Sequence, residues 1–174
     1  MFKFDSVDRA AMQIGVIGPG ADDATAEQYD LARQVGRLLA ELGARVVCGG
    51  LRGVMEGVAL GVYEVNGTCV GLLPGGDRAD ANPYLTVAVC TGIGEKRNEM
   101  VVDSSDALIA VGSNEGTVIE ALIAKKRGVS VFGLGFGQVA IEGRRLSAVI
   151  AAASPADAVN RAVDAARVWR RGTT

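Results

Sequence analysis

The segment VGSNEGTVIEAL, residues 111–122, joins two apolar runs through a short turn of small and polar residues. The run that ends at its first glycine, 106–111, is short and continuous, as is typical of a strand buried in a sheet. Helical spacing follows over 117–127, and three basic residues close that run, where a helix favours cations. The segment therefore predicts a strand, a tight turn and a helix in succession.

The same unit recurs along the chain of 174 residues, which suits one domain, 1–174, with 1–11 as a loose N-terminal segment. Alternating strands and helices predict an α/β fold: a Rossmann-like, doubly wound, mainly parallel sheet with helices on both faces. Ligands of such sheets bind at the carboxyl ends of the strands, where the strand order reverses. The predicted strands are 12–17, 45–48, 68–73, 85–90, 106–111, 129–133 and 149–152, and the predicted helices are 25–42, 54–65, 95–104, 117–127 and 155–169.

Composition excludes several classes of function. The chain has no histidine, which removes the commonest general base and zinc ligand, and we expect no metal site. A net charge of −2 without a basic stripe argues against nucleic-acid binding. Three separated cysteines and the lack of a signal peptide or membrane span predict a soluble, cytoplasmic protein.

Two glycine-rich turns follow the first two predicted strands. GVIGPGADD, 15–23, resembles the start of a dinucleotide fingerprint at Gly18 and Gly20, but the third glycine is missing, which favours a simple tight turn. CGGLRGVME, 48–56, would let the backbone bend closely over a ligand, or would only pack a strand against a helix. Both interpretations of the second turn stay open.

The turn inside the opening segment has the properties of an anion cradle. Gly116 and Thr117 are placed at the predicted helix start, where free N–H groups and partial positive charge attract a phosphate. Asn114 adds an amide that tolerates left-handed backbone. Alternatively, Thr117 and Glu120 form a capping box without chemistry, and Arg97 is an exposed helix residue.

Three stretches, CGGLRGVM, EKRNEMVVDSSDALIAVG and NEGTVIEAL, in this order, resemble the LOG-like family of Rossmann-type proteins. That family includes the LONELY GUY cytokinin-activating phosphoribohydrolases and the molybdenum cofactor carrier proteins. The resemblance covers about 12–135. GLLPG…ANPY and the pair Arg97-Asn98 look closer to the carrier branch. The name lysine decarboxylase, sometimes attached to this family, finds no support in this small chain with four lysines.

The resemblance implies a set of site residues. In the hydrolase motif PGGxGTxxE and its preceding arginine, the catalytic pair matches Arg97 and Glu120. This chain departs from the motif, with Gly112-Ser113-Asn114 in place of Pro-Gly-Gly, and Cys48 in place of the first glycine of GGGxxGxM. The predicted ligand- and phosphate-binding residues are Gly18, Gly49, Gly50, Gly53, Met55, Arg97, Asn98, Gly112, Ser113, Asn114, Gly116 and Thr117.

Two functions fit these residues. One is binding of a phosphate-bearing small molecule, either an AMP-like nucleotide or the molybdenum cofactor, with no required cofactor. The other is cleavage of a nucleoside 5′-monophosphate into base and ribose 5-phosphate. A structural or partner-binding role is a third hypothesis. We also expect a homo-oligomer, a dimer or tetramer, from the family and from the aliphatic helix residues Leu38, Val58 and Leu122.

Overall fold

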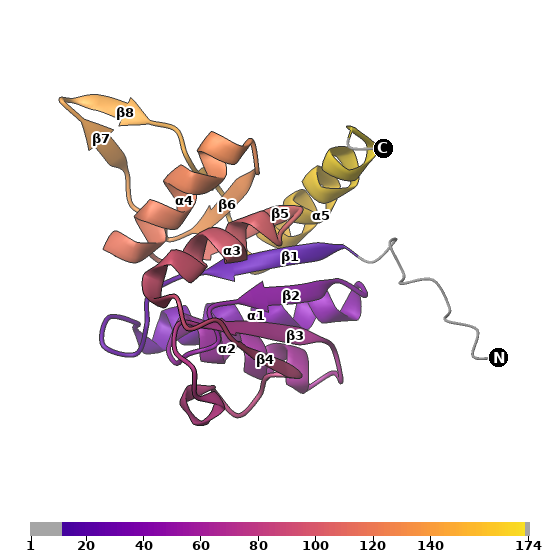
Figure 1. The fold of residues 1–174 in the computed structure, drawn as a ribbon. Helices are drawn as coiled ribbons and strands as arrows, with labels where there is room; N and C mark the ends of the chain where they lie inside the picture. The colour runs from indigo at the N-terminus through magenta and orange to yellow at the C-terminus, as the bar shows by residue number, and fades with distance from the viewer. Residues whose placement is uncertain (1–11, 173–174) are drawn as a thin grey trace.

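The computed structural model describes residues 12–172, so the predicted loose segment 1–11 lies outside the described residues. Seven parallel strands form one sheet in the order β4-β3-β2-β1-β5-β6-β9 (Figure 1). The chain adds β2, β3 and β4 on one side of β1 and then returns to place β5 on its other side. The strands are β1 (Gln13–Ile17), β2 (Arg45–Cys48), β3 (Cys69–Leu73), β4 (Val87–Cys90), β5 (Ala107–Val111), β6 (Val131–Leu134) and β9 (Ile150–Ala151).

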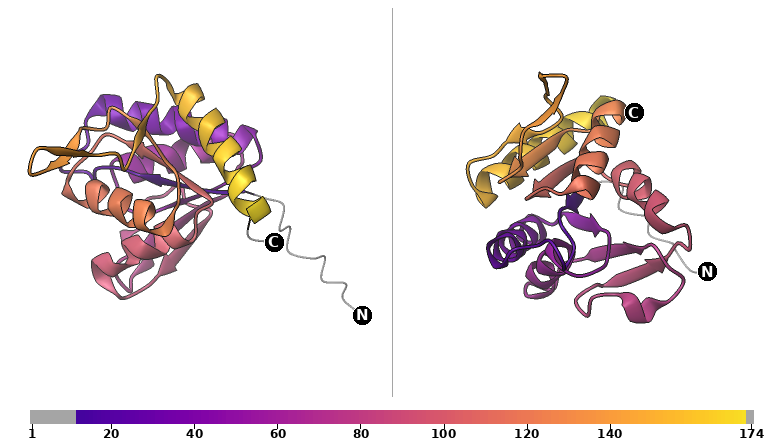
Figure 2. Two further views of the ribbon diagram at one scale, coloured as in Figure 1. Left: turned by 90° about the horizontal axis from the view of Figure 1, so that it is seen from above. Right: turned by 90° about the vertical axis from the view of Figure 1, so that its left-hand side faces the viewer.

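Helices cover both faces of this sheet, as the views in Figure 2 show, and the predicted Rossmann-like fold class is confirmed. On one face lie α1 (Ala26–Glu41), α2 (Val54–Tyr63) and α5 (Pro155–Gly172). On the other lie α3 (Arg97–Asp103) and α4 (Glu115–Arg127). Two short 3₁₀ helices, η1 (Arg78–Asp80) and η2 (Gly94–Lys96), lie in the connections around β4. None of the helices within 12–172 is long and apolar enough to cross a membrane.

The core is aliphatic and divided between the two faces. Ile14, Val16 and Ile109 pack toward α1, α2 and α5, whereas Ile17 and Leu108 pack toward α3 and α4. Val58 is fully buried in the core between the sheet and α1, α2 and α5, so its predicted place on an oligomer surface is wrong. Strand residues alternate between the two layers because neighbouring side chains in a strand point to opposite faces.

Two cysteines placed apart in the sequence meet in the sheet. Cys48 ends β2 and Cys69 begins β3, and their sulfur atoms lie 4.0 Å apart in the buried core without a disulfide. Cys48 Sγ also contacts Met55 O at 3.9 Å. The cysteine that replaces a family glycine therefore points into the core.

A small hairpin, β7 (Val139–Ile141) and β8 (Arg144–Leu146), was not predicted. Its two-residue turn, Glu142-Gly143, has positive φ at both positions, 49° and 74°. That turn geometry matches the twist of paired strands. Strands of three residues are too short to show a hydrophobic period, which explains why the pattern missed them.

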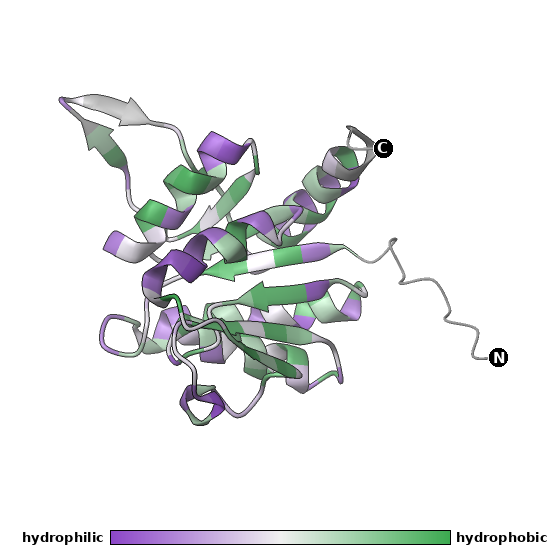
Figure 3. Ribbon diagram, in the orientation of Figure 1, coloured by the Kyte–Doolittle hydropathy of each residue, from purple (hydrophilic) through white to green (hydrophobic). Residues whose placement is uncertain are grey.

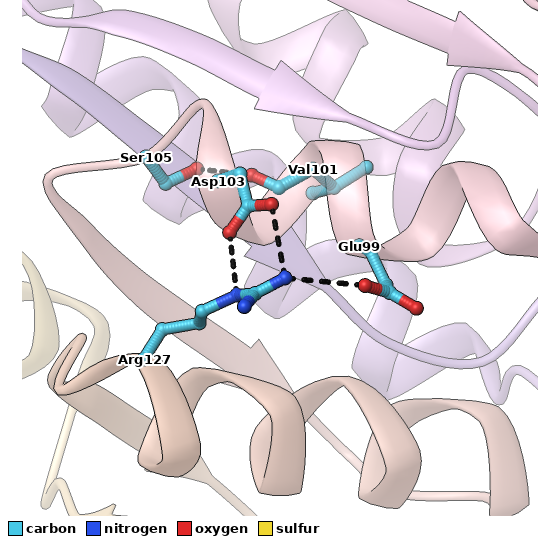
Figure 4. A network of polar contacts seen from close by, with 5 residues as sticks. All are labelled: Glu99, Val101, Asp103, Ser105 and Arg127. Carbon is cyan, nitrogen blue, oxygen red and sulfur yellow. Dashed lines mark hydrogen bonds and ion pairs between the residues drawn. The ribbon is translucent and has the colours of Figure 1, made fainter.

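An arginine fixes α3 against α4 (Figure 4). Arg127 Nε donates to Asp103 Oδ1 at 2.9 Å, and Arg127 Nη2 donates to Glu99 Oε2 at 3.2 Å. Ser105 Oγ donates to Val101 O at 2.7 Å and closes the end of α3. The predicted site residues Arg97 and Glu120 come from these two helices, so the clamp helps to set their relative positions.

Candidate functional site

A cavity of about 300 Å³ lies where the strand order reverses, at the carboxyl ends of β1, β2 and β5. This is the place where doubly wound sheets bind ligands. Among its lining residues are nine that the sequence singles out: Gly18, Gly49, Met55, Arg97, Asn98, Asn114, Gly116, Thr117 and Glu120.

Arg97 is a buried cation at this cavity. It is the first residue of α3 and only 8% exposed, so the alternative of an exposed helix arginine is wrong. Its Nε is buried and has no hydrogen-bond partner among the described residues. Burial lowers the pKa of Arg97, and the nearby Glu120 opposes that shift. An unpartnered buried donor costs free energy, which a bound acceptor would recover.

Glu120 faces the same cavity from α4. It is 7% exposed, and burial raises its pKa from 4.5 to about 7, while the positive charge of Arg97 acts in the opposite direction. Within the described residues, the two side chains form no ion pair within 4.0 Å. Both side chains line the cavity, and their opposite charges interact there without a direct ion pair.

The start of α4 differs from the prediction. The helix begins at Glu115, and its cap is Asn114, not Thr117. Asn114 Oδ1 accepts hydrogen bonds from Thr117 N at 3.0 Å and from Thr117 Oγ1 at 2.8 Å. The alternative capping box of Thr117 with Glu120 is therefore wrong, because Thr117 is already the third residue of the helix. Glu120 lies in the second turn and is free to face the cavity.

Asn114 also ties two walls of the site together. Its Nδ2 donates to Asp23 Oδ2 at 2.8 Å, in the loop after β1. The predicted left-handed backbone occurs at Gly112, with φ of 68°, whereas Asn114 is extended. The amides of Glu115 and Gly116 precede the first helical hydrogen bond, from Val118 N to Asn114 O, and remain the donors at this helix end.

Four predicted residues do not line the cavity. Gly50 and Gly53 shape the turn from β2 to α2, and Gly112 packs against Gln28. Ser113 Oγ accepts a hydrogen bond from Gly137 N at 3.3 Å. Six further lining residues were not predicted as site residues, although all six lie in stretches that the sequence analysis singled out: Val16, Ile17, Gly20, Leu51, Pro74 and Glu95.

Gly49 makes room for Arg97, which yields a prediction. A Cβ at this position would overlap Arg97 Nη1 and lie 2.6 Å from Met55 Sδ. We expect Gly49→Ala to displace the guanidinium, to weaken ligand binding on the order of tenfold, and to cost about 1–3 kcal/mol of stability through overpacking. Titration calorimetry and urea unfolding measure both effects. Gly76→Ala is the control, since nothing lies within 4 Å of a Cβ there, and equal losses in the two variants would contradict the role of Gly49.

Comparison with known proteins identifies the family. The sequence profile of the SLOG cluster4 family matches residues 11–159. The chain belongs to the SLOG cluster4 family. This agrees with the LOG-like resemblance of the sequence. An uncharacterised protein of Archaeoglobus fulgidus is 43% identical over 150 residues, which cover 86% of this chain and 93% of that protein.

Solved structures share the fold of this SLOG cluster4 chain. The molybdenum cofactor binding protein of Rippkaea orientalis has a TM-score of 0.79 at 30% identity, covering 88% of this chain and 96% of that one. The molybdenum cofactor carrier protein of Chlamydomonas reinhardtii has a TM-score of 0.78 at 29% identity, covering 89% and 98%.

Proposed function

We propose that the cavity at the carboxyl ends of β1, β2 and β5 binds a phosphate-bearing small molecule, and that the chain is a carrier-like binding protein of the molybdenum cofactor type. The observation that carries the proposal is the buried, unpartnered Nε of Arg97 at the cavity. A phosphate oxygen is a strong acceptor for a guanidinium, and the amides of Glu115 and Gly116 add donors at the positive end of α4. The resemblance to carrier proteins in sequence and in fold supports the same ligand class.

The size of the site fits one end of such a ligand. A cavity of about 300 Å³ is at the lower limit of usual small-molecule sites. A second groove of about 330 Å³ runs between α3 and α4, and both are lined by Glu95, Asn98 and Gly116. The phosphate would lie at Arg97, and the remaining part of the ligand would extend into this groove.

Asn114 supports binding over hydrolysis. It occupies the position of a glycine in the hydrolase motif, and its side chain takes up the N–H and hydroxyl of Thr117. Fewer free donors then face the phosphate than in a turn of Pro-Gly-Gly. The bound anion would depend more on Arg97 and less on the helix amides.

Cleavage of a nucleoside 5′-monophosphate is the second candidate, and Glu120 favours it. A carboxyl group with a pKa of about 7 is suited to transfer a proton at neutral pH, or to stabilise positive charge on a ribose ring when ionised. Arg97 would hold the phosphate while the base leaves. The same two residues would thus serve both candidates.

One experiment separates the candidates. The protein is incubated with AMP or with molybdopterin, and melting temperature and free adenine are measured. We expect a ligand at about 100 times its dissociation constant to add roughly 2.7 kcal/mol, or roughly 5–10 °C, with AMP left intact. Adenine release that disappears in Glu120→Ala would contradict the carrier proposal and establish the hydrolase. Absence of both a shift and release would contradict both.

A further inference from the structure

A carboxylate of the chain itself lies at the start of α4. Asp23 Oδ2 accepts a hydrogen bond from Asn114 Nδ2 at 2.8 Å, and Asn114 lines the Arg97 cavity, whereas Asp23 does not. Asp23 belongs to the connection between β1 and α1, in which Gly18 and Gly20 line the same cavity. Figure 3 shows this connection as a loop beyond the end of β1 that is hydrophilic at its tip. The contact therefore joins two walls at the rim of the cavity.

The side chain of Asn114 is fixed by its other contacts. Its Oδ1 accepts hydrogen bonds from Thr117 N at 3.0 Å and from Thr117 Oγ1 at 2.8 Å. Because these bonds set the orientation of the amide plane, the Nδ2 donor points in one direction, and that direction is taken by Asp23. Asn114 stands in place of a glycine of the hydrolase motif. This donor is therefore a feature of the chain and not of the motif.

Asp23 brings a negative charge to a place that suits an anion. The amides of Glu115 and Gly116 remain donors there, and the helix end carries partial positive charge. Among the described residues Asp23 has no ion-pair partner, so its charge is balanced by the amide of Asn114 and by the helix end. The buried, unpartnered Nε of Arg97 is the independent indication that an anion binds in the adjoining cavity. A phosphate and the Asp23 carboxylate are thus attracted to the same end of α4.

Release of the Asp23 carboxylate requires no change of the backbone. Asp23 N and Ala24 N donate to Gly20 O at 3.2 and 2.9 Å, and Val54 N donates to Pro19 O at 3.0 Å, which fixes the connection against the start of α2. The side chain of Asp23 is exposed, so rotation about its own bonds moves the carboxylate into water. The contact with Asn114 can open while the cavity wall stays in place.

We propose that Asp23 is an internal competitor for the anion that the site binds, and that a ligand phosphate displaces it from Asn114. The inference rests on the proposed function, since it concerns the regulation of the same site. In the empty protein, Asp23 holds the Asn114 donor. In the bound protein, Asn114 Nδ2 donates to the ligand and Asp23 turns to solvent. Because every ligand has to replace this contact, Asp23 lowers the affinity of the site and raises the ligand concentration at which it fills.

Titration calorimetry with AMP and with molybdopterin tests the competition. We expect Asp23→Ala to bind about tenfold more tightly than the wild type, because the hydrogen bond to a charged group no longer has to be replaced. The melting temperature of the empty protein should fall in the same variant, since the contact is lost. A purely structural contact would lower both stability and affinity. Unchanged or weaker binding by Asp23→Ala would overturn the proposal.

The neighbouring Asp22 offers a matched control. It is exposed and forms no side-chain hydrogen bond or ion pair within the part of the chain that the structure describes. Asp22→Ala removes the same charge one residue away, so its affinity should stay within about twofold of the wild type, as expected for a solvated surface charge. An equal gain in Asp22→Ala and Asp23→Ala would show a general effect of charge and would contradict the competition for Asn114.

Asn114→Ser tests whether Asp23 acts through Asn114. Serine is as good a helix cap as asparagine, so α4 should keep its start, but serine lacks the amide donor. In this background we expect Asp23→Ala to change the affinity by less than about twofold, because the contact that it removes is already absent. Circular dichroism and urea unfolding establish that the variants are folded. A gain of the same size in both backgrounds would overturn the proposal.

The same titrations distinguish failure of this inference from failure of the proposed function. Binding by the wild type without a gain in Asp23→Ala contradicts the competition and leaves the phosphate site intact. Binding of neither AMP nor molybdopterin, by the wild type or by Asp23→Ala, contradicts the phosphate site and the competition together. Binding by Asp23→Ala alone would support both.

Discussion

Arg97→Ala will weaken binding of phosphate-bearing ligands by on the order of 10–100-fold, since hydrogen bonds to charged groups contribute about 1.5–3 kcal/mol. The fold should survive, because the side chain that is removed carries a buried Nε without a partner among the described residues. Removing the Arg97 side chain loses its packing contacts, which lowers stability, but it also removes a desolvated charge, which raises stability. We therefore expect the free energy of unfolding to change by about 1 kcal/mol or less. Titration calorimetry with AMP or molybdopterin, and urea unfolding, measure the two effects.

Two further variants make that result specific. Arg97→Lys keeps the charge but loses the planar fork, so its affinity should lie between those of the wild type and Arg97→Ala. Arg52→Ala removes an arginine from the neighbouring β2–α2 turn, where it is 62% exposed and pairs with Glu56, so affinity should remain that of the wild type. Equal binding by Arg97→Ala and the wild type would place the ligand elsewhere.

Local patterns were sufficient to predict the sheet and its helices. Thr25 followed three residues later by Gln28 is the sequence pattern of a capping box, and the structure contains that box at the start of α1. Period and turn residues predicted the strand-and-helix alternation that gives the Rossmann-like fold class. The hairpin β7–β8 was not predicted, because its strands have only three residues each. The contact of Cys48 with Cys69 was not predicted either, because sequence spacing alone does not reveal which strands are neighbours.

The start of α4 shows where local patterns fail. Asn114 and Thr117 are both good capping residues, three positions apart, and the sequence around them favours neither. In the fold, Asn114 donates to Asp23, 91 residues away in sequence, which holds it in the capping position. The burial of Arg97 has the same origin, since it depends on the absence of a side chain at Gly49. The resemblance indicated both residues of the Arg97–Glu120 pair, but their burial and unpartnered atoms are properties of the tertiary structure.

Glu120→Gln will stabilise the protein at pH 8 by about 3 kcal/mol and leave its stability almost unchanged at pH 4. Burial raises the pKa of Glu120 from 4.5 to about 7 in the folded chain. Between these two values the native state binds more protons than the unfolded state, so the stability contributed by the protonated carboxyl is lost as pH rises. The difference corresponds to about 3 kcal/mol at roughly 1.4 kcal/mol per pKa unit. A glutamine stays neutral and avoids this loss.

Urea unfolding of the wild type and of Glu120→Gln from pH 4 to pH 8 measures the effect. All other groups titrate alike in the two proteins, so their contributions cancel in the difference between the two free energies of unfolding. This difference in the free energy of unfolding should grow from about pH 4.5 and become constant above pH 7. Glu27→Gln, at an exposed position of α1, serves as the control for the substitution itself. A bound anion beside Glu120 favours its protonated form, so ligand affinity of the wild type should also fall as pH rises through 7. A constant difference between Glu120→Gln and the wild type would show that this carboxyl group is ionised and well solvated, and it could then not take part in proton transfer at neutral pH.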